Sequence, residues 1–116
     1  MIEHQVYPAL NRELGAKRSA LAPQAEAAFR AFSTSVFAEG ALSSKIKQLI
    51  AVAAAHVTQC PYCIRGHTKA ALKSGASREE IMEAIWVAAE MRAGAAYAHS
   101  ALALDAMDEI KQRSDA

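Results

Sequence analysis

The residues with the clearest chemical potential stand in one segment, Cys60-Pro61-Tyr62-Cys63-Ile64-Arg65-Gly66-His67. On a helix that advances about 100° per residue, Cys60, Cys63 and His67 share one face. Cys63 and His67 are also i, i+4 neighbours, close enough for the imidazole to exchange a proton with the thiol. Both cysteines fall in the expected first turn of a helix, where free backbone N–H groups favour thiolate over thiol. The spacing therefore indicates a redox-active dithiol activated by a histidine.

Three other interpretations of this segment were weighed. The two cysteines could be buried and serve only as small apolar side chains. A zinc site could use the three residues of the motif, with His56 or His99 as a fourth ligand, although the usual second pair of ligands is missing. Haem attachment requires a histidine directly after the second cysteine, where Ile64 stands. We expect neither a bound metal nor a cofactor.

Together with its flanks, the motif resembles a known family. The run 45–53, the Cys60-x-x-Cys63-x-x-x-His67 element and the run 75–84 are similar to the core of the AhpD-like alkylhydroperoxidases. These belong to the wider carboxymuconolactone decarboxylase group, and the resemblance covers roughly residues 41 to 107. It implies an all-α protein that forms trimers or hexamers and reduces hydroperoxides through a disulfide cycle.

Carried over to this chain, the resemblance makes Cys60 and Cys63 the redox pair and His67 the proton-relay base. We expect His67 to take the proton of Cys63, whose thiolate attacks the peroxide to give a sulfenic acid. Cys60 then condenses with it, and an external dithiol reduces the disulfide. Two alternatives remain: a decarboxylase-like enzyme acting on a small organic acid or lactone, with Arg65 and Arg92 as candidate carboxylate ligands, and a non-enzymatic redox-sensing or metal-binding module.

One position departs from the family pattern, which usually has a glutamate twelve residues before the first cysteine. This chain has Gln48 there. An amide can hold His67 in one tautomer by hydrogen bonding, but it cannot accept a proton or stabilise imidazolium as a carboxylate would. His56, on the same expected helix and about 80° round from Gln48, is a candidate for a substitute proton path.

Composition limits the scaffold that positions these residues. The chain has 116 residues, of which 53% are apolar and 28 are alanine, the best helix former. An all-α single domain is expected, and an all-β fold is excluded because strand-favouring residues are too few. The formal charge of +1, without a basic cluster, argues against nucleic-acid binding. No apolar run approaches the roughly 20 residues that span a membrane, and no secretory signal is visible, so we expect a cytoplasmic protein.

The expected architecture is a compact bundle of about six helices in one domain, with N-terminal helices in residues 1–40 and the motif-bearing core in residues 41–112. Proline, glycine and serine residues mark most of the expected helix ends. The six helices are expected over Ile2 to Leu14, Pro23 to Gly40, Ser43 or Ser44 to Val57, Pro61 to Ser74, Ser77 to Ala89, and Tyr97 to Gln112. Ser77 and Glu80 form an expected capping box. Gly94 is expected to interrupt or bend the last two helices.

The alanine content also predicts self-association. Small side chains let helices approach closely, and a chain this short has more apolar surface than one small core needs. We expect a homo-oligomer, a trimer or a hexamer, with residues 93–103 at a subunit contact.

Overall fold

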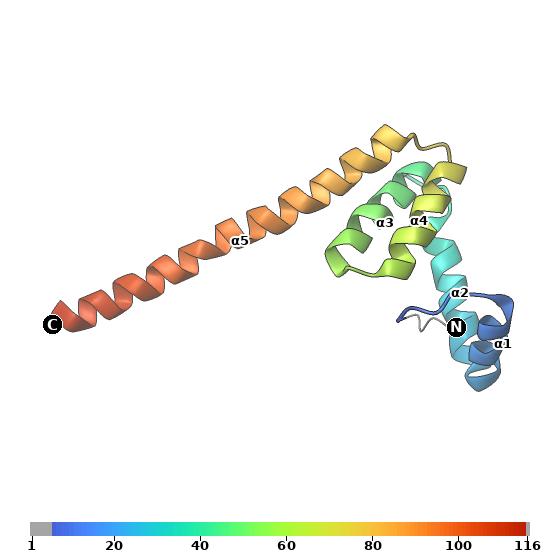
Figure 1. Ribbon diagram of the computed structural model, residues 1–116, viewed down its shortest axis with the longest axis horizontal. Helices are drawn as coiled ribbons and strands as arrows, with labels where there is room; N and C mark the ends of the chain where they lie inside the picture. Colours follow the sequence, from blue (N-terminus) through green and yellow to red (C-terminus); the bar gives the residue numbers. More distant parts are fainter. Residues whose placement is uncertain (1–5, 116) are drawn as a thin grey trace, which may run out of the picture. The chain divides into compact units, whose positions relative to one another are not determined.

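The computed structural model describes residues 6–115, and within them it contains five α-helices and no strand (Figure 1). This confirms the all-α fold. The number of helices is five rather than about six, because the last two expected helices are one. The chain divides into two compact units, residues 1–47 and residues 48–116, which are described separately.

The first unit contains α1 (Arg12–Leu21) and α2 (Pro23–Phe37), which pack against each other. The prediction of a helix from Ile2 to Leu14 is wrong for residues 6–11, which are not helical, whereas residues 12–14 form the start of α1. Positions 2–5 lie outside the described residues. The helix begins after Asn11, whose side-chain oxygen accepts the backbone N–H of Leu14 at 2.8 Å. This N-cap satisfies a free donor of the first turn and sets the start of α1.

The second helix begins at Pro23 as predicted, but it ends at Phe37 rather than near Gly40. Side chains from the start of the next helix account for the early end. Lys47 Nζ donates to the carbonyl of Ala38 at 2.6 Å, and Ser44 Oγ donates to the carbonyl of Phe37 at 3.2 Å. These bonds supply partners for carbonyls that a helix C-terminus leaves unpaired.

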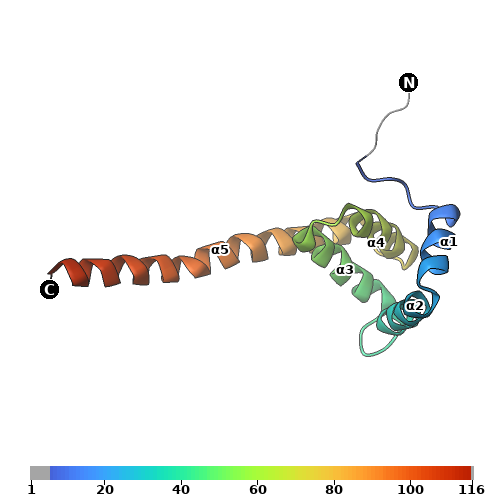
Figure 2. The ribbon, with the colours of Figure 1, turned by 90° about the horizontal axis from the view of Figure 1, so that it is seen from below.

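The second unit is built from most of α3 (Ser44–Thr58), α4 (Pro61–Lys73) and α5 (Arg78–Asp115). Helices α3 and α4 lie side by side, as the two views in Figures 1 and 2 agree. A small buried cluster joins these two helices to the first turns of α5, and its members are Val52, Ala71, Ala76 and Ile81, with Leu49 and Ile85 packed against it. The small side chains in this cluster fit the alanine-rich composition.

The connection between α4 and α5 follows the predicted signals. Gly75 has φ +95°, a left-handed conformation that glycine adopts without strain. Around it, Ala76 N–H bonds to the carbonyl of Ala71 at 2.9 Å, which closes α4 in a Schellman motif. The capping box is confirmed, because Ser77 Oγ accepts Glu80 N–H at 3.0 Å and Glu80 Oε1 accepts Ser77 N–H at 2.9 Å.

Helix α5 is continuous over 38 residues, so the predicted interruption at Gly94 is wrong. A glycine inside a helix costs about 1 kcal/mol relative to alanine, which a helix of this length tolerates. Every side chain described between residues 95 and 114 is exposed, and in both views α5 leaves α3 and α4 (Figure 2). The expectation of a compact bundle is therefore wrong for this unit. Within the described residues, no helix is long and apolar enough to cross a membrane.

Candidate active site

Cys60 lies in the connection between α3 and α4, which consists of Gln59 and Cys60. Gln59 has φ +58°, in the left-handed region, and the N–H of Cys60 bonds to the carbonyl of Ala55 at 3.2 Å. This is again the closing bond of a Schellman motif, here with a glutamine at the position that glycine usually occupies. Directly after the turn, Cys60 is the N-cap of α4, and Pro61 is the first helical residue as predicted.

The N-cap position places the Cys60 sulfur over the free amides of the first turn. Its Sγ accepts the backbone N–H of Cys63 at 3.4 Å. A hydrogen bond from the Cys63 thiol, and then those from the backbone amides of Cys63 and Tyr62, hold the pKa of Cys60 below its ordinary value. Both cysteines are half-buried thiols. Cys60 therefore has the environment of a stabilised thiolate.

Cys63 has the opposite environment. Its hydrogen bond to Cys60, followed by burial and the nearby negative charge of the Cys60 sulfur, raises the pKa of Cys63 above the ordinary value. Of the two thiols, Cys60 is therefore the one that loses its proton more readily. These directions favour Cys60 as the first thiolate, the reverse of the order expected from the sequence. The expected order rested on the i, i+4 spacing of Cys63 and His67, which does not take into account the N-cap position of Cys60.

His67 and Gln48 are brought together from α4 and α3. Gln48 Oε1 lies 2.8 Å from His67 Nδ1, and both side chains are partly buried. An amide oxygen only accepts, so Nδ1 of the neutral ring carries the proton and Nε2 is the basic nitrogen. The pair therefore has the tautomer that the sequence analysis anticipated for a proton relay from Cys63.

His56 makes a different contact. Its Nδ1 bonds to the carbonyl of Val52 one turn earlier on α3, at 2.7 Å, so this nitrogen is the donor. The ring is thereby held against its own helix. A proton path from His56 to the dithiol stays a prediction.

The sequence analysis missed the role of Gln59 and assigned Arg92 to a different one. Arg92, on α5, donates from Nη1 to the carbonyl of His56 at 3.4 Å. With its amide oxygen turned toward the guanidinium, Gln59 accepts from both terminal nitrogens of Arg92, at 3.1 Å for Nη2. This guanidinium therefore binds the turn that precedes Cys60. The available signal was a non-glycine residue at the junction of two helices, but no local pattern indicates which cation reaches it.

Two further candidates do not join the site. Arg65, offered as a carboxylate ligand, is exposed on α4, and His99, offered as a zinc ligand, is exposed on α5. In the part of the chain that the structure describes, no three histidine, cysteine or acidic side chains converge as metal ligands would.

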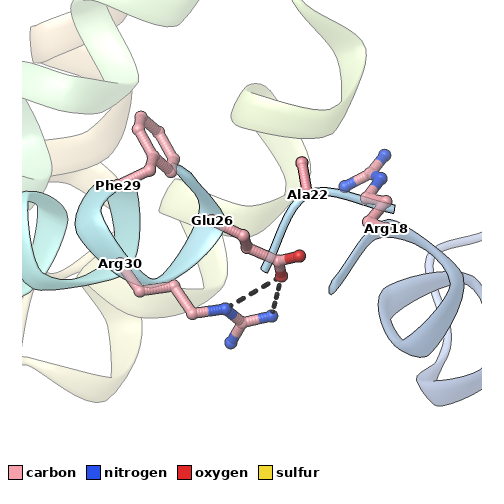
Figure 3. Close-up of a pocket in the computed structure, with 5 residues that line it drawn as sticks. All are labelled: Arg18, Ala22, Glu26, Phe29 and Arg30. Carbon is pink, nitrogen blue, oxygen red and sulfur yellow. Dashed lines mark hydrogen bonds and ion pairs between the residues drawn. The ribbon is translucent and has the colours of Figure 1, made fainter. Parts of the chain in front are cut away.

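A separate cavity of about 360 Å³ lies in the first unit, between the end of α1 and α2 (Figure 3). Its walls are formed by Arg18, Ala22, Glu26, Phe29 and Arg30. Glu26 Oε1 accepts from Arg30 Nη2 at 2.7 Å and from Nε at 3.0 Å, and this bond lowers the pKa of Glu26. The carboxylate and one guanidinium therefore neutralise each other. None of the residues of the dithiol site lines this cavity.

Known proteins resemble this chain over the whole site. The model of the carboxymuconolactone decarboxylase family matches residues 23–106. A Paracoccus denitrificans protein, named uncharacterized protein 4 in cox locus, is 69% identical over 83 residues, covering 72% of this chain and 75% of that protein. A crystal structure of a Methanobacterium thermoautotrophicum protein has a TM-score of 0.68 and 35% identity, over 72% of this chain and 93% of the other. A carboxymuconolactone decarboxylase family protein from Legionella pneumophila has a TM-score of 0.66 and 35% identity, over 84% and 87%.

Proposed function

This chain belongs to the carboxymuconolactone decarboxylase family, and we propose that within it the protein is a thiol-dependent, AhpD-like peroxidase that reduces hydroperoxides through Cys60 and Cys63. The observation that carries the proposal is the pairing of opposite environments. At the N-cap of α4 the Cys60 sulfur accepts the Cys63 amide, which favours its thiolate, whereas the pKa of Cys63 beside it is raised. A nucleophilic sulfur next to a protonated second thiol is the arrangement that a dithiol reductant requires.

The reaction balances with the two thiols as the reductant. The Cys60 thiolate attacks the terminal oxygen of the hydroperoxide, so that an S–O bond forms, the O–O bond breaks and an alcohol leaves after protonation. The product is a sulfenic acid on Cys60. The sulfur of Cys63 then displaces water from it and forms the disulfide. An external dithiol then reduces this disulfide by thiol–disulfide exchange. The external dithiol becomes a disulfide, and both cysteines return to thiols.

His67 serves the second step. Cys63 must lose its proton to attack the sulfenic acid, and His67 lies four residues further along the same helix. Its Nε2 is the nitrogen that accepts, because Nδ1 donates to Gln48. In the proposed cycle Gln48 fixes the tautomer of His67, and the proton taken by Nε2 is passed to the departing water.

We also propose that the protein works as a homo-oligomer, a trimer or hexamer. Large apolar side chains on α5 are exposed within one chain, among them Trp86 at 68%, Tyr97 at 83% and Leu104 at 58%. On a helix these three lie within about 20° of one another and form one stripe. Exposed apolar stripes of this kind mark contacts with other proteins, and the resemblance of the chain to oligomeric relatives favours copies of itself as the partner.

Peroxide turnover and trapping test the proposed peroxidase. We expect the protein to consume cumene hydroperoxide with dithiothreitol as reductant, and both Cys60→Ser and Cys63→Ser to lose this activity. After one addition of peroxide, Cys63→Ser is expected to retain a sulfenic acid on Cys60 that dimedone labels, because the second thiol is missing. Cys60→Ser is expected to give no label.

Control variants distinguish loss of the cysteine thiols from effects that any substitution could have on turnover. His99→Ala changes an exposed residue outside the site and is expected to keep full turnover. Unchanged turnover in both cysteine variants would disprove the dithiol cycle, and a dimedone label on Cys63 in place of Cys60 would reverse the proposed order. Stoichiometric zinc in freshly purified protein would contradict a free dithiol.

A further inference from the structure

The turn before Cys60 places a non-glycine residue in the left-handed backbone region. Gln59 holds φ at +58°, a region in which the Cβ of an L-residue is crowded by the backbone. Glycine is the usual residue at this point of a helix C-terminus, because it has no Cβ. The left-handed turn at Gln59 is therefore less favourable than the same turn at a glycine, and a contact from another helix can offset this cost.

Carbonyl groups of the same turn also need partners. The last four carbonyls of α3 belong to residues 55–58, and no backbone N–H inside the helix lies four residues further on to bond them. The Thr58 hydroxyl donates to the carbonyl of Ala55 at 3.4 Å. The carbonyl of Ala55 is taken by Cys60 N–H. The carbonyl of His56 receives the 3.4 Å bond from Nη1 of Arg92. A side chain on a helix 36 residues away in the sequence thus supplies one of the missing donors.

Arg92 contacts both the Gln59 side chain and the end of α3 with one guanidinium. Two hydrogens on Nη1 allow it to donate to the His56 carbonyl and to Gln59 Oε1, while Nη2 reaches the same amide oxygen at 3.1 Å. Because a guanidinium is a planar, rigid fork, these bonds fix the direction of the Gln59 side chain as well as the end of α3.

The conformation of the Gln59 turn determines where the Cys60 sulfur lies. Cys60 follows Gln59 directly, and its backbone at φ −95° and ψ 107° carries Sγ to the Cys63 amide at 3.4 Å. A different backbone conformation at Gln59 would rotate the next residue and carry this sulfur away from the first turn of α4. We propose that Arg92 is a positioning residue of the dithiol, which holds the left-handed Gln59 turn and thereby keeps the Cys60 sulfur at the N-cap of α4.

The inference rests on the proposed function only in taking Cys60 and Cys63 as the active site. Its test measures the reactivity of the Cys60 thiol and requires no peroxide. Iodoacetamide alkylation of Cys60 is followed against pH by mass spectrometry of the peptide. In Arg92→Ala we expect the pH midpoint of alkylation to move upward, and the rate at pH 7 to fall about twofold, since thiolate is lost from the capping position.

A rescue variant distinguishes positioning from a simple effect of charge. Glycine adopts φ +58° without help, so Gln59→Gly is expected to keep a nearly unchanged alkylation profile, and Arg92→Ala added to it is expected to cause no further shift. Arg113→Ala removes the same charge from the far end of α5, where Arg113 lies 3.6 Å from Glu109, and is expected to leave the profile unchanged.

Two results would overturn the inference. One is an unchanged alkylation profile in Arg92→Ala. The other is an equal upward shift in the presence and absence of Gln59→Gly, which would assign the effect to the charge of Arg92 and not to the turn. Circular dichroism of each variant verifies that the helices are retained. A parent protein without peroxide turnover, together with the expected alkylation shift in Arg92→Ala, would count against the peroxidase and leave the positioning role of Arg92 in place.

Discussion

Gln48 and His67 form a hydrogen bond of 2.8 Å between α3 and α4, and this bond determines which ring nitrogen of the histidine is basic. The acceptor is an amide oxygen, which carries no charge. When Nε2 takes up a proton, the resulting imidazolium therefore has a neutral neighbour where a carboxylate would stabilise it. The choice between an amide and a carboxylate at position 48 is thus expected to change how strongly the protonated form of His67 is stabilised.

Gln48→Glu is expected to raise peroxide turnover. A carboxylate in place of the amide makes the bond to His67 charge-assisted, which stabilises the protonated ring by about 1 kcal/mol more and corresponds to about fivefold in rate. Steady-state turnover with cumene hydroperoxide and dithiothreitol measures this. Gln112→Glu adds the same charge to an exposed position at the end of α5 and is expected to have no effect. A lower rate in Gln48→Glu than in the parent protein would contradict the assigned role.

The two cysteines are expected to respond in opposite directions when one of them is replaced. Cys63→Ala removes the hydrogen bond that lowers the pKa of Cys60 most, so the pKa of Cys60 should rise and its thiolate fraction at neutral pH should fall. Cys60→Ala removes the hydrogen bond and the negative charge that raise the pKa of Cys63, so that pKa should fall. Ultraviolet absorbance of the thiolate during a pH titration checks both signs. Shifts of the same sign in the two variants would contradict the opposite pKa directions assigned to the two thiols.

The capping box predicts a loss of stability in Ser77→Ala. The serine hydroxyl accepts the N–H of Glu80, and alanine leaves this donor without its partner in the first turn of α5. The expected cost is about 1 kcal/mol, or a decrease in Tm of about 4 °C. Thermal unfolding followed by circular dichroism measures it. Ser114→Ala, at the exposed end of α5, is the matched control and should leave Tm unchanged.

Self-association is expected to depend on the apolar stripe of α5. Leu104→Glu places a charge in this stripe, and the variant should elute as a smaller species than the parent protein in size-exclusion chromatography at micromolar concentration. Ala106 is also exposed, but it lies about 160° round the helix from Leu104. Ala106→Glu should therefore keep the assembly. A parent protein that elutes as a monomer would contradict the proposed oligomer.

Local signals in the sequence predicted the parts of the fold that depend on neighbouring residues. Pro61 marked the first residue of α4, and Ser77 with Glu80 marked the start of α5, because each feature is a property of one helix terminus. The same kind of signal was misread at Gly94, since a helix interior tolerates a single glycine when both sides favour helix. At Asn11 the cap itself was overlooked, and the start of α1 was placed too early.

In the candidate site, too, contacts between residues close in sequence could be predicted, whereas a contact between distant helices could not. Cys60, Cys63 and His67 were identified from their spacing, since they lie within two turns of one helix. The Gln48–His67 bond joins residues 19 apart and was anticipated through the family pattern. The contact between Gln59 and Arg92 depends on where α5 passes the end of α3, and no local pattern encodes that.

The N-cap position of Cys60 also bears on the energetics of electron transfer. A disulfide between Cys60 and Cys63 has no anionic sulfur, so whatever stabilisation the amides of α4 give to the thiolate is present only in the reduced form. Stabilising the reduced form raises the reduction potential of the pair, by 30 mV for each 1.4 kcal/mol. In the proposed cycle, the first turn of α4 would therefore make the disulfide easier to reduce.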